Sequence, residues 1–323
     1  MQFNTLTLNR GRMRRMSAIA VAAAAVAGSF LAAEPGTPAL AGSTDWKVYS
    51  PTNPDYPQKV DFVVPCSVVK MANDDAIVFP GRPGASHNHT FSGNLGITAS
   101  STPESLLKTQ SNCKLSADRA SYWTPTLYAN GAAVTPTTTR AYYRAGTRNG
   151  ASIKPMPFGL RMIAGDAKAM APQDARIAGF HCRDTSGALT SKTSLPPRCP
   201  SNAFLEASVV FPNCWDGKNL DSADHKSHMA YADWKTFACP TGYPVHLPQL
   251  TVAQRYPVNA TLNKAVTLAA MPMPGMTMDS RLTLHADFMN AWDTATMKAL
   301  VQRCINASVA CEDVTNRRLP PGM

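Results

Sequence analysis

The amino-acid sequence predicts a mainly β, or β-dominated α+β, fold: a single sandwich-like domain with long disulfide-braced loops and few short helices. Three observations support this class. The 323 residues include 26 prolines and 19 glycines, which favour turns and short extended segments over long helices. Apolar runs are short and are bounded by Pro, Gly or Asn, as is typical of strands. The eight cysteines are an even number and can supply four disulfides.

The expected strands are spread along the chain. They cover residues 60–64, 76–79, 122–128, 141–144, 160–163, 207–211, 250–253 and 266–269. Asn130-Gly131 lies between two apolar stretches and predicts a two-residue hairpin turn, because both residues tolerate a positive φ.

Few helices are expected, and two can be placed. A short one should begin at Pro103, with Thr102 as its N-cap. Asp293 should cap a second helix, in which apolar residues recur at helical spacing from Met297 to Cys304.

Composition excludes several classes of protein. Hydrophobic residues make up 44% of the chain and charged residues 16%, which excludes a disordered chain, a coiled coil and a collagen-like fibre. The formal net charge of +10 becomes +7 without residues 1–41, which contain four arginines and one glutamate. Because the remaining charges are scattered, we expect no nucleic-acid partner. A mildly positive surface would suit an anionic wall polymer or lipid, or would only keep the protein soluble.

Residues 1–41 are expected to be a signal peptide. Four arginines between positions 10 and 15 precede an Ala/Val-rich run, and Ala39-Leu40-Ala41 has the small-x-small pattern of a cleavage site. The run of about 17 residues is short for a membrane span, which needs about 20. We therefore expect a secreted, extracellular protein with no membrane span after processing. Arg14-Arg15 leaves the export route open.

The mature chain contains no low-complexity linker and no internal repeat, so we expect one domain at residues 60–311. An N-terminal extension at residues 42–59 should precede it, and a flexible tail at residues 312–323 should follow it.

All eight cysteines follow residue 41 and should be paired in an exported chain. The absence of Cys-x-x-Cys argues against a zinc ribbon or a redox site. Eight cysteines allow 105 pairings. Proximity in sequence suggests Cys182–Cys199, Cys214–Cys239 and Cys304–Cys311, which leaves Cys66–Cys113.

Three clusters of polar residues carry the candidate chemistry. The candidate catalytic residues are His87, His89, Asp221, Asp224, His225, His228, His285 and Asp287. His87 and His89 of the first cluster are two positions apart, as are His285 and Asp287 of the last, so each pair shares one face of an extended segment. His225 and His228 of the middle cluster are three apart, which makes them neighbours in a helix or tight turn. Either at least two clusters converge on one site, or each anchors its own loop.

Several reactions fit these residue types. Two carboxyl groups of unequal pKa, from Asp221, Asp224 or Asp287, could cleave a glycosidic bond. His225 or His285 could instead abstract a proton in a lyase. The sequence contains no Gly-x-Ser-x-Gly elbow, phosphate loop or dinucleotide fingerprint. Paired cysteines would also leave no thiol nucleophile.

A bound metal is the main alternative, because a neutral imidazole is also a metal ligand. The candidate ligands for a divalent metal, zinc or copper, are His87, His89, His225, His228 and His285. Four methionines between positions 271 and 278 could offer thioethers to copper, or could simply belong to a flexible Pro-rich loop. The sequence leaves the cofactor open.

Aromatic and polar residues beside these clusters are candidate substrate contacts, since flat rings stack on sugars and polar groups bond sugar hydroxyls. They are Tyr122, Trp123, Trp215, Asp216, Lys218 and Asn219. The alternative for each aromatic residue is a place in the core with its polar tip satisfied.

Ordered blocks of sequence resemble the family called domain of unknown function 1996 (DUF1996). Among them are Ser86-His87-Asn88-His89, residues 121–128, 159–166, 211–221 and 224–228, and His285-Ala286-Asp287-Phe288. The resemblance covers about residues 60–305 and departs from the family pattern just before His285, where a Met-rich segment replaces a Gly-Asp turn. It implies an extracellular protein of bacterial or fungal type. The family's occasional fusion to WSC carbohydrate-binding modules points to cell-wall polysaccharide.

We therefore expect a secreted protein that acts on extracellular or cell-wall polysaccharide through a His/Asp-rich cleft, as a hydrolase or a lyase. An extracellular metal-binding protein and a non-catalytic wall-glycan-binding module are the alternatives. The catalytic and metal hypotheses depend on His and Asp side chains that are distant in sequence meeting in one hollow.

Overall fold

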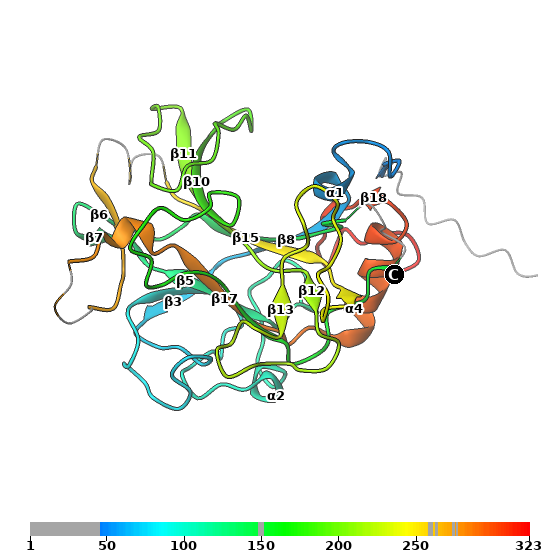
Figure 1. Ribbon diagram of the computed structural model, residues 1–323, viewed down its shortest axis with the longest axis horizontal. Coiled ribbons are helices and arrows are strands. Elements are labelled where there is room, and N and C mark those ends of the chain that lie inside the picture. The colour runs from blue at the N-terminus through cyan, green and yellow to red at the C-terminus, as the bar shows by residue number, and fades with distance from the viewer. Residues whose placement is uncertain (1–45, 148–151, 258–260, 262–263, 273–274, 276) are drawn as a thin grey trace, which may run out of the picture. The chain divides into compact units, whose positions relative to one another are not determined.

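Two large β-sheets face each other in the computed structural model, which describes residues 46–147, 152–257, 261, 264–272, 275 and 277–323 (Figure 1). The first sheet has the order β10-β11-β15-β8-β2-β19, with bounds Ala178–Asp184, Ala203–Val210, Gln249–Arg255, Thr138–Arg144, Asp61–Cys66 and Glu312–Asp313. The second has the order β3-β4-β5-β17-β9, with bounds Val68–Ala72, His89–Gly93, Ser121–Pro125, His285–Met289 and Arg161–Gly165. With 33% strand and 9% helix, the predicted mainly β class is confirmed.

Smaller elements surround these sheets. Three minor sheets contain β1 (Lys47–Val48) with β18 (Val309–Ala310), β13 (Met229–Ala230) with β12 (Cys214–Trp215) and β14 (Val245–His246), and β16 (Val266–Leu268) with β6 (Leu127–Ala129) and β7 (Ala132–Ala133). The described helical segments are α1 (Tyr56–Lys59), α2 (Pro103–Leu106), α4 (Thr294–Leu300), η2 (Ser280–Leu282) and η3 (Val301–Ile305).

The main core lies between the two sheets. Phe62 of β2 stacks on Tyr143 of β8 at 4.8 Å between ring centroids. The hydroxyl of Tyr143 in turn forms a 2.7 Å hydrogen bond with that of Tyr122 in the facing sheet. A second apolar cluster covers the outer face of the five-stranded sheet, where Phe91 and Trp123 pack against loop residues such as Ile77. The loops at the bottom of Figure 1 cover this face.

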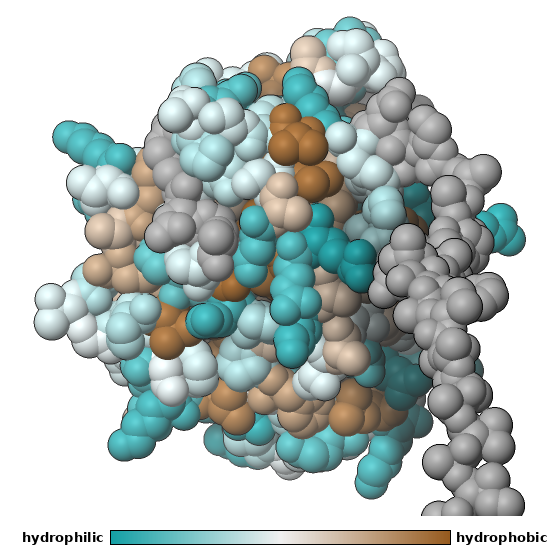
Figure 2. Space-filling view, turned by 90° about the vertical axis from the view of Figure 1, so that its right-hand side faces the viewer, coloured by the Kyte–Doolittle hydropathy of each residue, from teal (hydrophilic) through white to brown (hydrophobic). Residues whose placement is uncertain are grey.

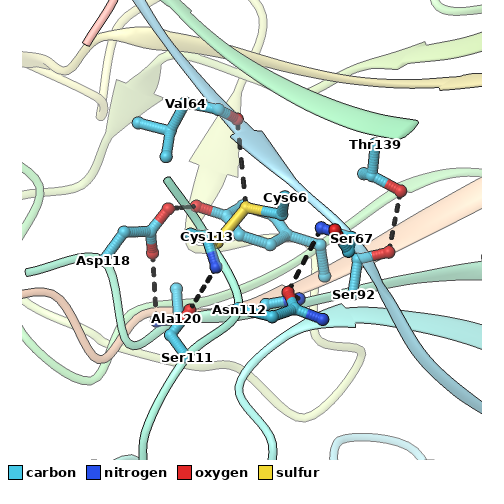
Figure 3. The surroundings of a disulfide bond; sticks show 12 residues. Val64, Cys66, Ser67, Ser92, Ser111, Asn112, Cys113, Asp118, Ala120 and Thr139 are labelled. Carbon is cyan, nitrogen blue, oxygen red and sulfur yellow. Dashed lines mark hydrogen bonds between the residues drawn. A yellow bond between two sulfur atoms is a disulfide. The ribbon is translucent and has the colours of Figure 1, made fainter. Parts of the chain in front are cut away.

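Four disulfides connect the chain. They are Cys66–Cys113, Cys182–Cys199, Cys214–Cys239 and Cys304–Cys311, the same pairs that sequence proximity suggested. Figure 3 shows the Cys66–Cys113 bond next to the carboxyl group of Asp118. Four disulfides fit a protein of an oxidising compartment.

Most local predictions agree with the structure. Asn130 and Gly131 both have positive φ and connect the paired strands β6 and β7, as the hairpin prediction requires. Thr102 caps α2, and the Asp293 side chain accepts a hydrogen bond from the amide of Thr296 at the start of α4.

Two strand predictions were wrong. Residues 76–79 form a turn, because the Asp75 side chain accepts hydrogen bonds from the amides of Ile77 and Val78. The predicted strand at 122–128 is interrupted at Thr126, so its halves belong to two different sheets, as β5 and β6.

Both ends of the described chain differ from the expected extension and tail. Tyr49 and Tyr56 are buried in the main core, and β1 pairs with β18. At the other end, β19 pairs in parallel with β2, and Asp313 forms an ion pair with Arg140. Residues 46–59 and 312–323 are therefore part of the fold because they pair and pack with it.

Surface features of the described residues are mixed. The face in Figure 2 shows small hydrophobic patches among hydrophilic side chains. No helix within the described ranges is long and apolar enough to cross a membrane. The predicted signal peptide, like Met273 and Met276, lies outside the described residues.

Candidate metal centre

Strands β4 and β17 bring two histidines and an aspartate together on the outer face of the five-stranded sheet. β5 lies between them, with Pro125 opposite His89 and Trp123 opposite Asp287. His285, two residues before Asp287, therefore begins β17 beside the end of β5. His89, His285 and Asp287 are only 0%, 3% and 1% exposed.

Backbone carbonyl groups determine which nitrogen of each histidine ring carries the proton. Nδ1 of His89 donates to the carbonyl oxygen of Asp74 at 2.9 Å, and Nδ1 of His285 donates to that of Thr283 at 2.7 Å. Because a carbonyl oxygen can only accept, the Nε2 atom of each neutral ring carries a lone pair. The two Nε2 atoms face each other at 3.4 Å, and neither has a proton to share.

His87 completes a cluster of three imidazoles. Its ring centroid lies 4.2 Å from that of His89 and 5.0 Å from that of His285. One ring nitrogen from each of the three histidines lies within 4.8 Å of the others. Both ring nitrogens of His87 are buried without a hydrogen-bond partner among the described residues. Buried polar atoms in this state are rare in folded proteins, and a bound ion would supply the missing partner.

Two carboxyl groups lie beside the imidazoles. Oδ2 of Asp287 is 4.0 Å from Nε2 of His285 and has no hydrogen-bond partner within the described residues. Asp75, from the loop after β3, uses Oδ1 to accept two backbone amide hydrogen bonds at 2.8 Å. One oxygen of each carboxyl group lies within 4.8 Å of the other and of a ring nitrogen of His89.

Burial shifts the pKa of every member of this cluster. It lowers the pKa of His87 to about 4 and of His285 to about 3, and it holds the pKa of His89 well below its usual value. It raises the pKa of Asp75, and it raises the pKa of Asp287 well above its usual range, where the charge of Asp75 adds to the effect. The imidazoles are therefore neutral at pH 7, which is the form that binds a metal ion.

Residues 221–228 border the cluster, but their side chains are held in bonds of their own loop. The ring of His225 forms a 2.8 Å hydrogen bond with Asp221, which also forms an ion pair with Arg161. The exposed carboxylate of Asp224 accepts hydrogen bonds from the hydroxyl and amide of Ser227. The loop acts on the cluster through charge, because Lys226 favours the ionised form of Asp287 and His225 that of Asp75.

His228 does not share a site with His225. It is buried, and Nε2 donates to the carbonyl oxygen of Arg161 at 2.7 Å. Its Nδ1 lies 2.9 Å from the hydroxyl oxygen of Ser222, which donates its own proton to Asp224. Of the three predicted clusters, the structure thus brings His87/His89 and His285/Asp287 together and leaves the 225/228 histidines in local bonds.

The predicted substrate contacts divide into two groups. Tyr122 and Trp123 are fully buried, so in the structure neither ring is available to a substrate, contrary to expectation. Trp215 is half-buried, and its indole N–H donates to the carbonyl oxygen of Asn219. Asp216 accepts hydrogen bonds from the amides of Lys218 and Asn219, so these four residues form a turn near the surface.

Sequence reasoning missed Asp75 as a member of the cluster. The signal in the sequence is that Asp75 directly precedes an apolar stretch, which includes the buried Ile77. A loop that lies in solvent has no need of such a stretch. The indole N–H of Trp123 also favours the ionised form of Asp75, although the two side chains form no hydrogen bond of normal geometry.

Two other groups of Cys, His and Asp have the spacing of metal ligands within the described residues. They are Cys214, Cys239 and His246, and Cys66, Cys113 and Asp118. Their sulfur atoms are bonded in disulfides, so they offer no thiolate to a metal.

A surface hollow of about 360 Å³ reaches the cluster at His87. Asn73, Asn88, Tyr128 and Met271 also line it. Through His87, this hollow connects the cluster with solvent.

Fold and site together define a disulfide-braced β-sandwich with a buried His/Asp cluster on one outer face. The family model of the domain of unknown function DUF1996 matches residues 75–292, and the chain belongs to this family. The match confirms the resemblance to DUF1996, and its range includes every residue of the cluster, from Asp75 to Asp287. No curated protein and no solved structure matches the chain.

Proposed function

We propose that this protein binds one divalent metal ion through His87, His89, His285 and Asp287. The observation that carries the proposal is the 3.4 Å approach of two Nε2 atoms, on His89 and His285, whose protons are both placed on Nδ1. Two lone pairs repel at this distance. A cation bound to both nitrogens turns the contact into a favourable one.

The 3.4 Å spacing between His89 and His285 suits tetrahedral zinc. Zinc–imidazole bonds are about 2.0–2.1 Å long, so two nitrogens on a tetrahedral zinc ion stand about 3.3–3.4 Å apart. A square-planar or octahedral ion with similar bonds would bring adjacent nitrogens to about 2.8–3.0 Å. Zinc also accepts both imidazole and carboxylate ligands. Zinc is therefore a better candidate than square-planar copper(II).

A divalent ion would also explain the buried carboxyl groups. Oδ2 of Asp287 has no hydrogen-bond partner among the described residues, and a cation in contact with it would favour its ionised form. Asp75 need not bind the ion, because backbone amides already hold its Oδ1. Its charge would still stabilise a cation a few ångströms away.

Elemental analysis of the processed protein, purified without chelator, tests the proposal. We expect about one zinc ion per chain. Changes outside the ligands of zinc sites already lower affinity by about 10- to 100-fold, so His87→Ala and His285→Gln should each lower it at least as much. His87 makes no hydrogen bond within the described residues, so its replacement should leave the fold intact.

His246→Ala is the matched control, because His246 lies on β14, outside the cluster. It should retain the zinc content of the unchanged protein, with the same circular dichroism spectrum. A protein that takes up neither zinc nor copper after dialysis against each would contradict the proposal. Equal zinc affinity of the His87→Ala variant and the unchanged protein would do the same.

Secretion and action on an extracellular or cell-wall polysaccharide stay predictions from the sequence. The carboxylates expected as acid and base, Asp221 and Asp224, are engaged in loop bonds, and Asp287 is buried. The metal proposal therefore accounts for more of the geometry than glycan cleavage at these residues does.

A further inference from the structure

The outer face of the six-stranded sheet carries a polar cavity that the metal proposal does not use. Its volume is about 610 Å³, and outward-facing side chains of β2, β8, β15, β11 and β10 form its floor. His181, Glu206, Ser208 and Thr251 of this floor are each at most 5% exposed. A buried sheet face is normally apolar, so a buried polar face indicates a ligand of matching polarity.

Some of the floor satisfies itself. Glu206 accepts hydrogen bonds from His181 at 2.8 Å and Arg255 at 2.6 Å, and it also pairs with Arg183. This network connects strands β10, β11 and β15 and compensates the charge of Glu206.

Two atoms of the floor remain without a partner among the described residues: Oδ1 of Asp61 and Nδ1 of His181. Asp61 is 9% exposed and His181 4%, and buried polar atoms of this kind normally have a hydrogen-bond partner. Both residues line the cavity. A ligand hydroxyl, which both donates and accepts, can satisfy either atom.

Basic side chains outnumber acidic ones around the cavity. Its lining includes Lys59, Arg144, Arg176, Arg183 and Lys192, against Asp61 and Glu206. Lys192 is half-buried, and within the described residues its ammonium group has no hydrogen-bond or ion-pair partner. Burial lowers its pKa to about 8, so an anion beside it would stabilise its charged form.

The aromatic rings at the cavity are already covered. Arg144 and Arg140 lie over the ring of Tyr142, at 4.3 and 5.4 Å from its centroid. Arg176 lies 5.1 Å from the ring centroid of Trp234. Since arginines occupy these faces, a flat base has little to stack on, which argues against a nucleotide.

The polar surface continues beyond the first cavity. A second depression of about 700 Å³ shares Lys59, Asp61, Tyr142 and Arg183 with it. Arg140, Arg255 and Arg318 line the added part, together with the acidic residues Glu312 and Asp313. These two adjoining depressions form one groove, and its volume exceeds what a small ion needs.

We propose that this groove binds an oligosaccharide whose sugar units carry anionic groups. Lys192 and Arg144 are placed to hold the carboxylate, sulfate or phosphate group, and Asp61 and His181 to bond sugar hydroxyls. Arg144 has donors to spare, because its hydrogen bonds to Gln58 and Thr251 use only part of its guanidinium group. The groove and the His/Asp cluster lie on the outer faces of different sheets, so this proposal does not depend on the metal.

Isothermal titration calorimetry on the processed protein tests the groove with four probes: hexagalacturonate, sulfated dextran, phosphomannan and neutral dextran. At least one anionic probe should bind, more weakly as salt rises, and neutral dextran should not. Which anionic probe binds best identifies the anionic group. Lys192→Gln should weaken that binding about 10-fold, the effect of losing one charge-assisted hydrogen bond.

Lys192→Arg should restore binding because it keeps the charge, and Lys108→Gln, which changes an exposed lysine outside the groove, should leave it unchanged. The His87→Ala variant should bind the oligosaccharide normally, which separates this proposal from the metal site. The proposal is overturned if no probe binds, if neutral dextran binds as tightly as the anionic probes, or if Lys192→Gln has no effect.

Discussion

Asp118 is buried beside the Cys66–Cys113 disulfide, where it accepts hydrogen bonds from the hydroxyl of Tyr122 at 2.6 Å and the amide of Ala120 at 3.1 Å (Figure 3). Burial raises its pKa from 3.8 to about 7, although both hydrogen bonds favour the ionised form. Between these two pH values the folded state therefore binds more protons than the unfolded state. The contribution of this group to stability falls as the pH rises through that window, and the loss is complete above the folded pKa.

Replacement by asparagine should remove this pH dependence, because an amide does not titrate in the window. Relative to the unchanged protein, Asp118→Asn should be more stable at pH 8 than at pH 4.5, by up to about 3 kcal/mol. Urea unfolding at both pH values, with the disulfides intact, measures the difference. A stability difference between the two proteins that is the same at pH 4.5 and pH 8 would contradict the assignment.

Single residues also show what the sequence can and cannot predict about the site. The spacing of two predicted that His87 and His89, and His285 and Asp287, share a face, because side chains alternate along a strand. The sequence could not predict that the Asp74 and Thr283 carbonyls bind Nδ1, nor that burial would make the rings neutral. These facts depend on which strands become neighbours.

At the scale of elements, the start of β17 is positioned by close contact with the end of β9. Gly165 is paired with His285 and has a φ of +79°. A Cβ atom at Gly165 would lie 2.5 Å from the carbonyl oxygen of Leu284 and 2.9 Å from Cα of His285. The glycine is required here both by its backbone conformation and by the approach of β17.

Gly165→Ala should therefore displace β17 and with it His285. We expect zinc affinity to fall by about 10-fold or more, as for other changes around metal ligands. Gly131→Ala is the matched control, because Gly131 also has a positive φ, +80°, but an added Cβ would meet nothing within 4 Å. It should destabilise the protein by about 1 kcal/mol and leave zinc affinity unchanged. Competition with a chelator of known affinity measures the zinc affinity of both variants. Equal zinc affinities of the Gly165→Ala and Gly131→Ala variants would refute the positioning role.

Elements with strong local signals were predictable from the sequence, and the others were not. The Asn130-Gly131 turn and the Thr102 and Asp293 caps depend on neighbouring residues, and all three are present. The turn at 76–79 depends instead on the side chain of Asp75, which competes with strand pairing. Apolar composition alone could not reveal that.

At the scale of the whole molecule, the two proposed sites lie on opposite surfaces of a layered fold. The main core occupies the space between the sheets, so each sheet is left with an outer face to cover or to expose. Loops and a second apolar cluster cover the five-stranded sheet around the histidines. The six-stranded sheet instead presents the polar groove. The sequence predicted the class of this fold, but it could not predict which residues would face outward on which sheet.

The Cys66–Cys113 disulfide joins the end of β2, in the groove-bearing sheet, to the segment that leads into β5 of the other sheet. It closes a sequence separation of 47 residues, whereas Cys304–Cys311 closes one of 7. In the chain-entropy model a longer closed loop restricts the unfolded chain more, by about 4 kcal/mol for the first bond and about 2 kcal/mol for the second.

Both bonds are buried, so replacing each pair by alanines changes the packing to a similar extent. The Cys66→Ala/Cys113→Ala variant should therefore lose about twice as much free energy of unfolding in urea as Cys304→Ala/Cys311→Ala. Equal losses, or the reverse order, would mean that local packing around the sulfur atoms, rather than restriction of the unfolded chain, sets the contribution of these bonds.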